Sequence, residues 1–263
     1  MIDRLGAEVY RPPMATLGLS FVLLDHAVYP EPEAVIAAAA ELGLELRYTG
    51  REGEGPDGYE VAGGATLLVM LVDAPHPDAA TLPPGLASPS PEEVEAHAAH
   101  LIITTMSLPD APRDADTLQV KLTAAVVGAS PAIAAMLGHG VVLHRAGFFT
   151  DIAAGPISVL PLLVCVDVTI AAEADERMSF LTHGLQRYGR EEFFVTASRT
   201  GQGAVDFLLA LVGWMLDDPD KQLPTGDTVG RTADEQVRIQ RVANPTGEGP
   251  EVIRLDLDLG EPA

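Results

Sequence analysis

Residues Phe180–Arg241 read FLTHGLQRYGREEFFVTASRTGQGAVDFLLALVGWMLDDPDKQLPTGDTVGRTADEQVRIQR, and this stretch decides the fold class. The apolar run Phe193–Val195 predicts a strand, because turn residues stand on both sides of it. Apolar residues then recur at helical spacing over Val205–Leu216, which predicts a helix that ends at the following Asp-Asp-Pro. We expect this helix to be largely buried, with Trp214 in its apolar stripe. Strands and helices that follow one another in this way indicate an α+β protein with antiparallel sheets.

The N-terminal part of the chain has the same mixed character. Its pattern predicts strands and helices in the order βαββαβ, which is the order of the ferredoxin-like fold with both helices on one face of an antiparallel sheet. The apolar strand Ala65–Val72 should lie in the centre of its sheet. We therefore divide the chain into a ferredoxin-like unit, 1–110, and a C-terminal α+β unit, 111–263, which form either two domains or one continuous domain. The elements expected in the first unit are strands 16–24, 44–48, 65–72 and 101–106 and helices 33–42 and 90–100, and further along we expect a short helix 130–137 and a buried strand 162–170.

Composition excludes several classes of partner. The formal charge is −22 and the isoelectric point is about 4.4, so the surface repels nucleic acid and anionic membranes. The single cysteine, Cys165, lies in an apolar run, which predicts a buried thiol and excludes an intramolecular disulfide. The N-terminus lacks the pattern of a signal peptide, and no apolar run is long enough to span a membrane, so we expect a cytoplasmic protein.

Three motifs carry a resemblance to a known family. They are T-x-G-L at 182–185, Y-G-R-E-E at 188–192 and G-D-T-V-G at 226–230, and the last is followed by a charged amphipathic strand. They resemble the C-terminal block of the bacterial family called domain of unknown function 4261, and the similarity extends over residues 16–257. The resemblance implies an intracellular bacterial α+β protein without an accepted activity, and some members of that family look like neighbours of toxin and immunity genes.

One set of residues has the spacing of metal ligands. Glu93, His97 and His100 occupy positions i, i+4 and i+7, which lie on one face of a helix and would supply a carboxylate and two imidazoles. The set lacks the H-E-x-x-H pattern of zinc proteases. We therefore expect no bound metal and no cofactor, with His100 capping the helix end and His97 packing at the sheet edge.

The other polar candidates lie in residues 180–241. His183, Tyr188 and Glu192 lie close together in sequence, and Asp227 lies in a turn that Gly226 and Gly230 permit. A pocket between His183 and Asp227 is one candidate for a functional site. No nucleophile elbow and no phosphate-binding loop accompany these residues.

Three functional hypotheses remain. The first is a non-catalytic binding protein, immunity-like or accessory, whose acidic surface engages another protein with basic character. The second is an enzyme or metal-dependent factor centred on His183 and Asp227 or on Glu93, His97 and His100. The third is a structural component of a larger assembly. The sequence does not determine the oligomeric state.

Overall fold

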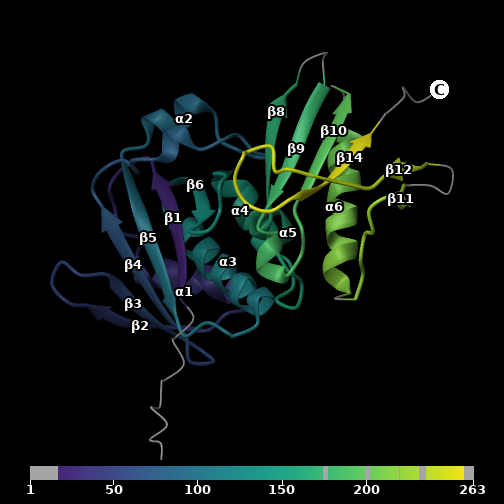
Figure 1. Cartoon of the computed structure of the whole chain (residues 1–263). Coiled ribbons are helices and arrows are strands. Elements are labelled where there is room, and N and C mark those ends of the chain that lie inside the picture. The colour runs from purple at the N-terminus through teal and green to yellow at the C-terminus, as the bar shows by residue number, and fades with distance from the viewer. Residues whose placement is uncertain (1–16, 174–176, 199–201, 219, 231–234, 258–263) are drawn as a thin grey trace, which may run out of the picture.

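A computed structural model of the chain describes residues 17–173, 177–198, 202–218, 220–230 and 235–257. Within these residues the strands form a seven-stranded sheet, called the large sheet here, a five-stranded sheet, called the small sheet, and a separate two-stranded sheet (Figure 1). The large sheet is antiparallel throughout, and helices lie beside both sheets. The α+β fold class predicted from the sequence is therefore confirmed.

The large sheet has the strand order β2-β3-β4-β5-β1-β6-β7. Strand β4 has a neighbour on each side, as its apolar sequence predicted. Residues 130–137, which we expected to be helical, instead contain β6, because pairing with β1 outweighs the helix preference of an Ala-rich segment. The strands are β1 (Gly18–Leu24), β2 (Leu46–Arg51), β3 (Asp57–Val61), β4 (Thr66–Val72), β5 (Ala99–Met106), β6 (Ala132–Leu137) and β7 (His144–Arg145).

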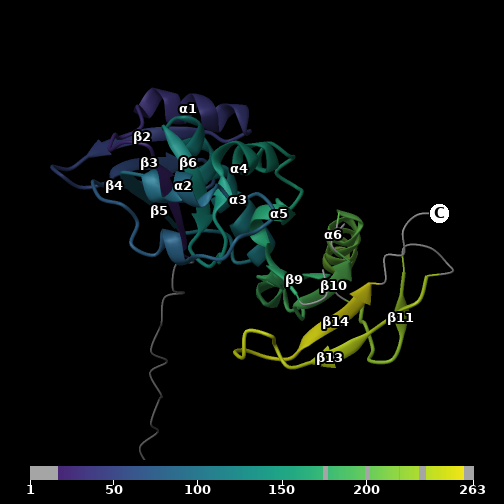
Figure 2. The same ribbon diagram turned by 90° about the horizontal axis from the view of Figure 1, so that it is seen from above.

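One face of the large sheet is covered by helices. Helix α1 (Pro32–Glu41) and helix α3 (Pro112–Gly128) pack against each other there, and α4 (Ala146–Ala153) packs against α3 (Figures 1 and 2). Both α1 and α3 have proline in the first turn, where the missing N–H costs no hydrogen bond. The β1 side chains Val22 and Leu24 point to this face and share one core cluster with residues of both helices.

In the part of the chain that the structure describes, the opposite face of the large sheet is covered only at one end. Helix α2 (Pro91–Ala96) and the 3₁₀ helix η1 (Ala79–Thr81) pack there against Leu23 of β1 and Met136 of β6. The ferredoxin-like unit predicted for residues 1–110 is not confirmed. The expected helix 90–100 stops at Ala96, because the chain must then extend to enter β5, and it lies on the wrong face. The helix that covers the sheet beside α1 is α3, which follows residue 110.

The small sheet has the strand order β13-β14-β10-β9-β8. Its pairs are antiparallel except for β10 and β14, which run parallel. Helix α6 (Gln202–Asp217) packs against it, which confirms the predicted helix in this region. The strands are β8 (Asp167–Ala172), β9 (Arg177–His183), β10 (Phe193–Ser198), β13 (Gln240–Val242) and β14 (Val252–Leu257), and the separate two-stranded sheet consists of β11 (Thr228–Val229) and β12 (Val237–Arg238).

Two expectations about this half of the molecule were wrong. Trp214 is 44% exposed, because α6 buries only the side that carries Leu208 and Val212. The segment 162–170 is not one strand: the helical turn α5 (Leu162–Cys165) precedes β8, since a short apolar run does not distinguish a buried strand from a buried helix. Cys165 is buried, as predicted.

The two sheets share their interior. A single cluster of buried apolar side chains contains Leu101 and Ile103 of the large sheet together with Val195 and Leu255 of the small sheet. Helices α3, α4 and α5 lie between the sheets in Figure 1. The division of the chain near residue 110 remains a prediction, and the large sheet takes strands from both sides of that position.

Candidate functional site

The large sheet has an open face on the side opposite α1 and α3. In antiparallel pairs, residues that stand directly opposite each other point to the same side of the sheet. The register pairs Phe21 with Ile102 and Ile102 with Met70, so their side chains lie together. By the same rule, and because side chains alternate along a strand, the open face consists of Leu17, Leu19, Phe21, Thr66, Leu68, Met70, Ile102, Thr104 and Met106.

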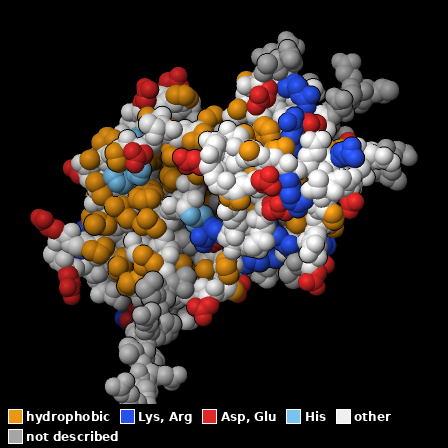
Figure 3. Space-filling model, in the orientation of Figure 1, with side chains coloured by type: hydrophobic (Ala, Val, Ile, Leu, Met, Phe, Trp, Pro, Cys, Tyr) orange, Lys and Arg blue, Asp and Glu red, His pale blue; other side chains and the backbone are white. Residues whose placement is uncertain are grey.

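This open face is apolar and solvent-accessible. Leu17, Leu19 and Met70 are 64%, 37% and 39% exposed, and the other members are half-buried. Figure 3 shows a broad patch of hydrophobic side chains over β4, β5 and β1. These strands contain no Asp, Glu, Lys or Arg at all. Contiguous apolar surfaces of this kind are rare on monomers and mark sites of interaction.

Three histidines lie where the open face meets α2. The ring of His76 contacts the ring of Phe21, with centroids 4.9 Å apart, and the ring of His100, at 5.1 Å. The backbone N–H of His76 donates to Nε2 of His97 over 2.7 Å. Burial lowers the pKa of His76, and the neighbouring His100 and His97 lower it further. The uncharged form of His76 is therefore favoured at this end of the face.

The predicted metal set does not assemble. Helix α2 ends before His97, so Glu93, His97 and His100 do not share a helix face. The carboxylate of Glu93 accepts from the N–H of Ser90 and forms an ion pair of 2.9 Å with Arg145. Nδ1 of His97 contacts the carbonyl of Val94, and Nδ1 of His100 lies 2.8 Å from the carbonyl of Ala74. Each of these groups thus has its own structural partner.

The part of the chain that supplies β1 to β5 is strongly acidic. Residues 17–110 contain 2 Arg and no Lys against 15 Asp and Glu, which gives a formal charge of −13. Both arginines are paired, Arg47 with Glu60 and Arg51 with Asp57. Glu60 of β3 stands opposite Thr66 of β4, and Arg47 of β2 stands opposite Glu60. Residues that stand opposite each other point to the same side of the sheet, so this ion pair borders the open face. The negative charge in this part of the chain is therefore in large excess.

Glu192, one of the predicted site residues, is a buried structural group. Its carboxylate accepts hydrogen bonds from Oγ1 of Thr182 over 2.7 Å and from the N–H groups of Gly184 and Gln186 over 2.9 and 3.3 Å. Burial raises the pKa of Glu192. These contacts hold the turn between β9 and the 3₁₀ helix η3 (Leu185–Tyr188).

Tyr188 links α3 to η3. Its hydroxyl donates to Asp116 over 2.7 Å, and the Arg187 guanidinium donates to the same carboxylate over 2.6 and 3.2 Å. Burial raises the pKa of Tyr188. A cavity of about 200 Å³ lies beside this pair and is lined by Asp116, His139 and Arg187 and by Leu19 of the open face. Because the Asp116 carboxylate already accepts these hydrogen bonds, we interpret it as a structural link.

The last two predicted residues lie apart from this link. Nε2 of His183 is 3.0 Å from Oγ1 of Thr169, and burial lowers the pKa of His183. Asp227 is exposed, and its backbone pairs with Pro224 and Ile239 at the turn before β11. Within the residues that the structure describes, no hydrogen bond or ion pair connects His183, Tyr188, Glu192 and Asp227 with one another.

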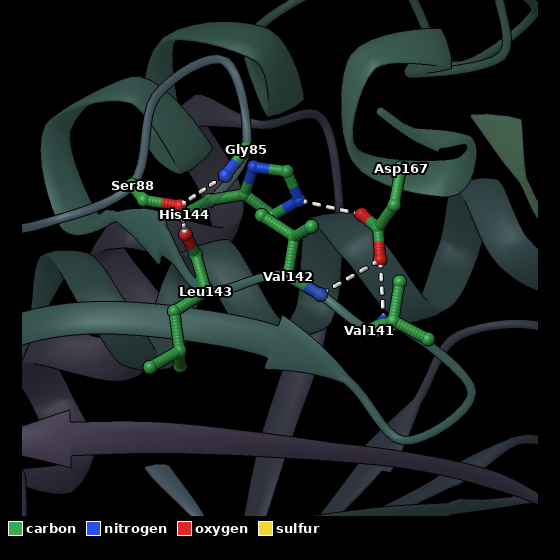
Figure 4. Close-up of polar contacts among 7 residues, drawn as sticks. All are labelled: Gly85, Ser88, Val141, Val142, Leu143, His144 and Asp167. Carbon is green, nitrogen blue, oxygen red and sulfur yellow. Dashed lines mark hydrogen bonds and ion pairs between the residues drawn. The ribbon is translucent and has the colours of Figure 1, made fainter. Parts of the chain in front are cut away.

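The sequence did not reveal a polar network centred on Asp167, at the start of β8 (Figure 4). Oδ2 of Asp167 accepts from the N–H groups of Val141 and Val142 over 2.6 and 3.1 Å. Oδ1 lies 2.9 Å from Nε2 of His144. Because a carboxylate only accepts hydrogen bonds, Nε2 carries a proton and donates to Asp167. The network joins a loop of the large sheet to the small sheet.

This network does not have the geometry of a catalytic triad. The hydroxyl of Ser88 donates to the carbonyl of Leu143 and accepts from the N–H of Gly85, each over 2.9 Å. His144 is buried, and its Nδ1 has no hydrogen-bond partner among the described residues. A triad requires the histidine to accept the proton of the nucleophile. Here the serine proton is directed to a carbonyl instead, so the arrangement is structural.

The open face itself was missed by sequence reasoning. The signal was present, because β1, β4 and β5 are apolar at both odd and even positions, which is typical of strands with both faces covered. Among the residues that the structure describes, only one of those faces receives helices along its whole length.

Comparisons with protein-family models, with curated proteins and with solved structures gave no match. The resemblance to domain of unknown function 4261 therefore remains a prediction. None of the described helices is long and apolar enough to cross a membrane.

Proposed function

We propose that this chain is a non-catalytic binding protein that docks another protein on the open face. The observation that carries this proposal is the uncharged, solvent-accessible surface of β4, β5 and β1 in a chain whose formal charge is −22. Leaving such apolar side chains in water costs free energy that a partner would recover by covering them.

The polar candidates favour binding over catalysis. Glu192, Asp116 and Asp167 are buried and accept hydrogen bonds from the backbone or from neighbouring side chains. A general base or nucleophile needs a free lone pair within reach of a substrate. The contacts of these carboxylates are instead those of groups that hold turns and helices in place.

The energetic centre of the proposed interface is Met70, flanked by Phe21 and Ile102. Full burial of one such side chain is worth about 1.5–3 kcal/mol relative to full exposure. These side chains are already partly buried, so each supplies a fraction of that value and several must act together. Interfaces commonly concentrate their binding free energy in a few central side chains of this kind.

The test uses a photo-crosslinking amino acid at Met70 in the full-length protein, expressed in its native host. A matched probe at Val159, which is 56% exposed and lies outside the open face, serves as the control. The Met70 probe should crosslink a defined protein that the Val159 probe does not. That protein is then purified, and its affinity for the parent chain and for the Met70→Arg and Val159→Arg variants is measured.

We expect Met70→Arg to weaken this complex by about tenfold or more and Val159→Arg to change it by less than about twofold. Thermal unfolding of both variants checks that each remains folded. A reconstituted complex that is insensitive to Met70→Arg would place the partner elsewhere on the molecule and remove the proposal.

A further inference from the structure

We infer that the partner element on the open face is an amphipathic α-helix whose apolar stripe is bordered by Lys and Arg side chains. This inference rests on the function proposed above and adds the chemistry of the partner. The width of the face, the pairing of its strands and the charges near it support this choice of partner.

The width of the open face fits one helix. Strands β4, β5 and β1 are consecutive in the sheet, and neighbouring strands lie about 4.8 Å apart, so the outer two are separated by about 10 Å. An α-helix with its side chains is about 10–12 Å in diameter. The same strands already accept α1 and α3 on their other side, so their pleated surface is suited to helix packing.

A partner strand is a poorer fit. A strand binds by adding to the edge of a sheet, where backbone N–H and C=O groups are unpaired. Strands β4, β5 and β1 each have neighbours on both sides, so their backbone groups are engaged within the sheet. Only side chains are available on this face, and a helix presents side chains in the same way.

The charges around the open face select a basic partner. Asp73, an exposed carboxylate, directly follows β4 at the end of the face that α2 borders. Asp78, also exposed, adjoins the His76 cluster. The two arginines of residues 17–110 already have acidic partners. Lys and Arg beside an apolar stripe would therefore meet carboxylates on docking.

A second copy of this chain is disfavoured by the same charges. Packing two open faces together would bring the exposed carboxylates Asp73 and Asp78 of one copy close to those of the other, within two segments that each carry a formal charge of −13 and whose arginines are already paired. A helix with basic borders is attracted by the same negative charge that would repel a second copy.

The inference is tested with synthetic fluorescent peptides of about 18 residues, a length that spans about 27 Å as a helix. The first contains Leu and Lys at helical spacing, the second has the same composition with Leu and Lys alternating, and the third replaces Lys by Glu. Binding to the full-length protein is followed by fluorescence anisotropy at low and at high salt. The helical Leu/Lys peptide should bind at least about tenfold more tightly than the other two, and its affinity should fall as salt screens the charges.

The variants Met70→Arg and Leu19→Arg should weaken binding of the helical Leu/Lys peptide about tenfold, and Val159→Arg should leave it within about twofold. An equal loss in Val159→Arg would mean unspecific attraction to an acidic surface and would overturn the inference. The inference would also be overturned if the protein formed a dimer in solution that Met70→Arg dissociates. The same holds if the protein bound neutral phosphatidylcholine vesicles as tightly as the peptide and this binding depended on Met70. If the helical Leu/Lys peptide does not bind but binding of the crosslinked partner still depends on Met70, the proposed function stands and the inference of a basic helix is refuted.

Discussion

Replacing Asp167 with alanine should destabilise the whole protein, because this carboxylate joins the two sheets. Asp167 is 3% exposed and accepts from two backbone N–H groups and from the imidazole of His144. Hydrogen bonds to a charged group are worth about 1.5–3 kcal/mol each, and every donor left unpaired in the interior adds a desolvation cost. The buried carboxylate itself is costly to desolvate, and its removal offsets part of the loss. With three donors left without their acceptor, the net loss should be about 3–5 kcal/mol.

The assay is urea and thermal unfolding of the full-length protein. For a chain of this size, about 1 kcal/mol shifts the melting temperature by about 2–4 °C, so Asp167→Ala should lower it by about 6–20 °C. The variant Asp167→Asn keeps one acceptor oxygen and should lose less. Asp206, which is exposed on α6, provides the matched control, and Asp206→Ala should change stability by less than about 0.5 kcal/mol. If Asp167→Ala melted like the parent, the network in Figure 4 would not hold the sheets together, and its interpretation as structural would fail.

Two further predictions concern His76 and Trp214. Because the pKa of His76 lies below its ordinary value of 6.5, the unfolded chain binds the proton more tightly, and the free energy of unfolding should fall as the pH drops below 6.5. His76→Phe should reduce this pH dependence, to which the lowered pKa of His183 also contributes, and an unchanged slope would contradict the assignment. Trp214 is half-exposed, so Trp214→Ala should cost about 1–2 kcal/mol in urea unfolding, whereas Leu208→Ala in the core of the same helix should cost about 2–5 kcal/mol. Equal losses would show that Trp214 is as deeply packed as Leu208.

Local patterns predicted several elements well. Ser90 followed by proline and glutamates predicted the start of α2, and the structure has the reciprocal hydrogen bonds of a capping box there. The periodicity of residues 205–216 predicted α6, and the apolar runs predicted β1, β4 and β5. In each case the signal lies within a few residues of sequence, because caps and periodicity are local properties of the chain.

The errors arose where contacts with segments distant in the sequence determine the position of a residue. The metal set of Glu93, His97 and His100 depended on a helix that continued past Ala96, but entry into β5 ends the helix and directs His97 and His100 to different carbonyls. Likewise, no pattern around residue 167 indicates that its carboxylate accepts N–H groups from residues 141 and 142. Such contacts depend on the relative placement of two sheets, which sequence spacing does not encode.

The sequence by itself determined the α+β class, the acidic charge and the apolar character of both sides of β1, β4 and β5. Only the tertiary structure decided which of those sides would be covered. Helices α1 and α3 are 10 and 17 residues long and cover one side, whereas α2 has 6 residues and covers one end of the other. The apolar pattern of a strand indicates that burying its side chains lowers the free energy. It does not indicate whether the burying surface belongs to the same chain or to a partner, because the hydrophobic effect depends on the apolar area removed from water.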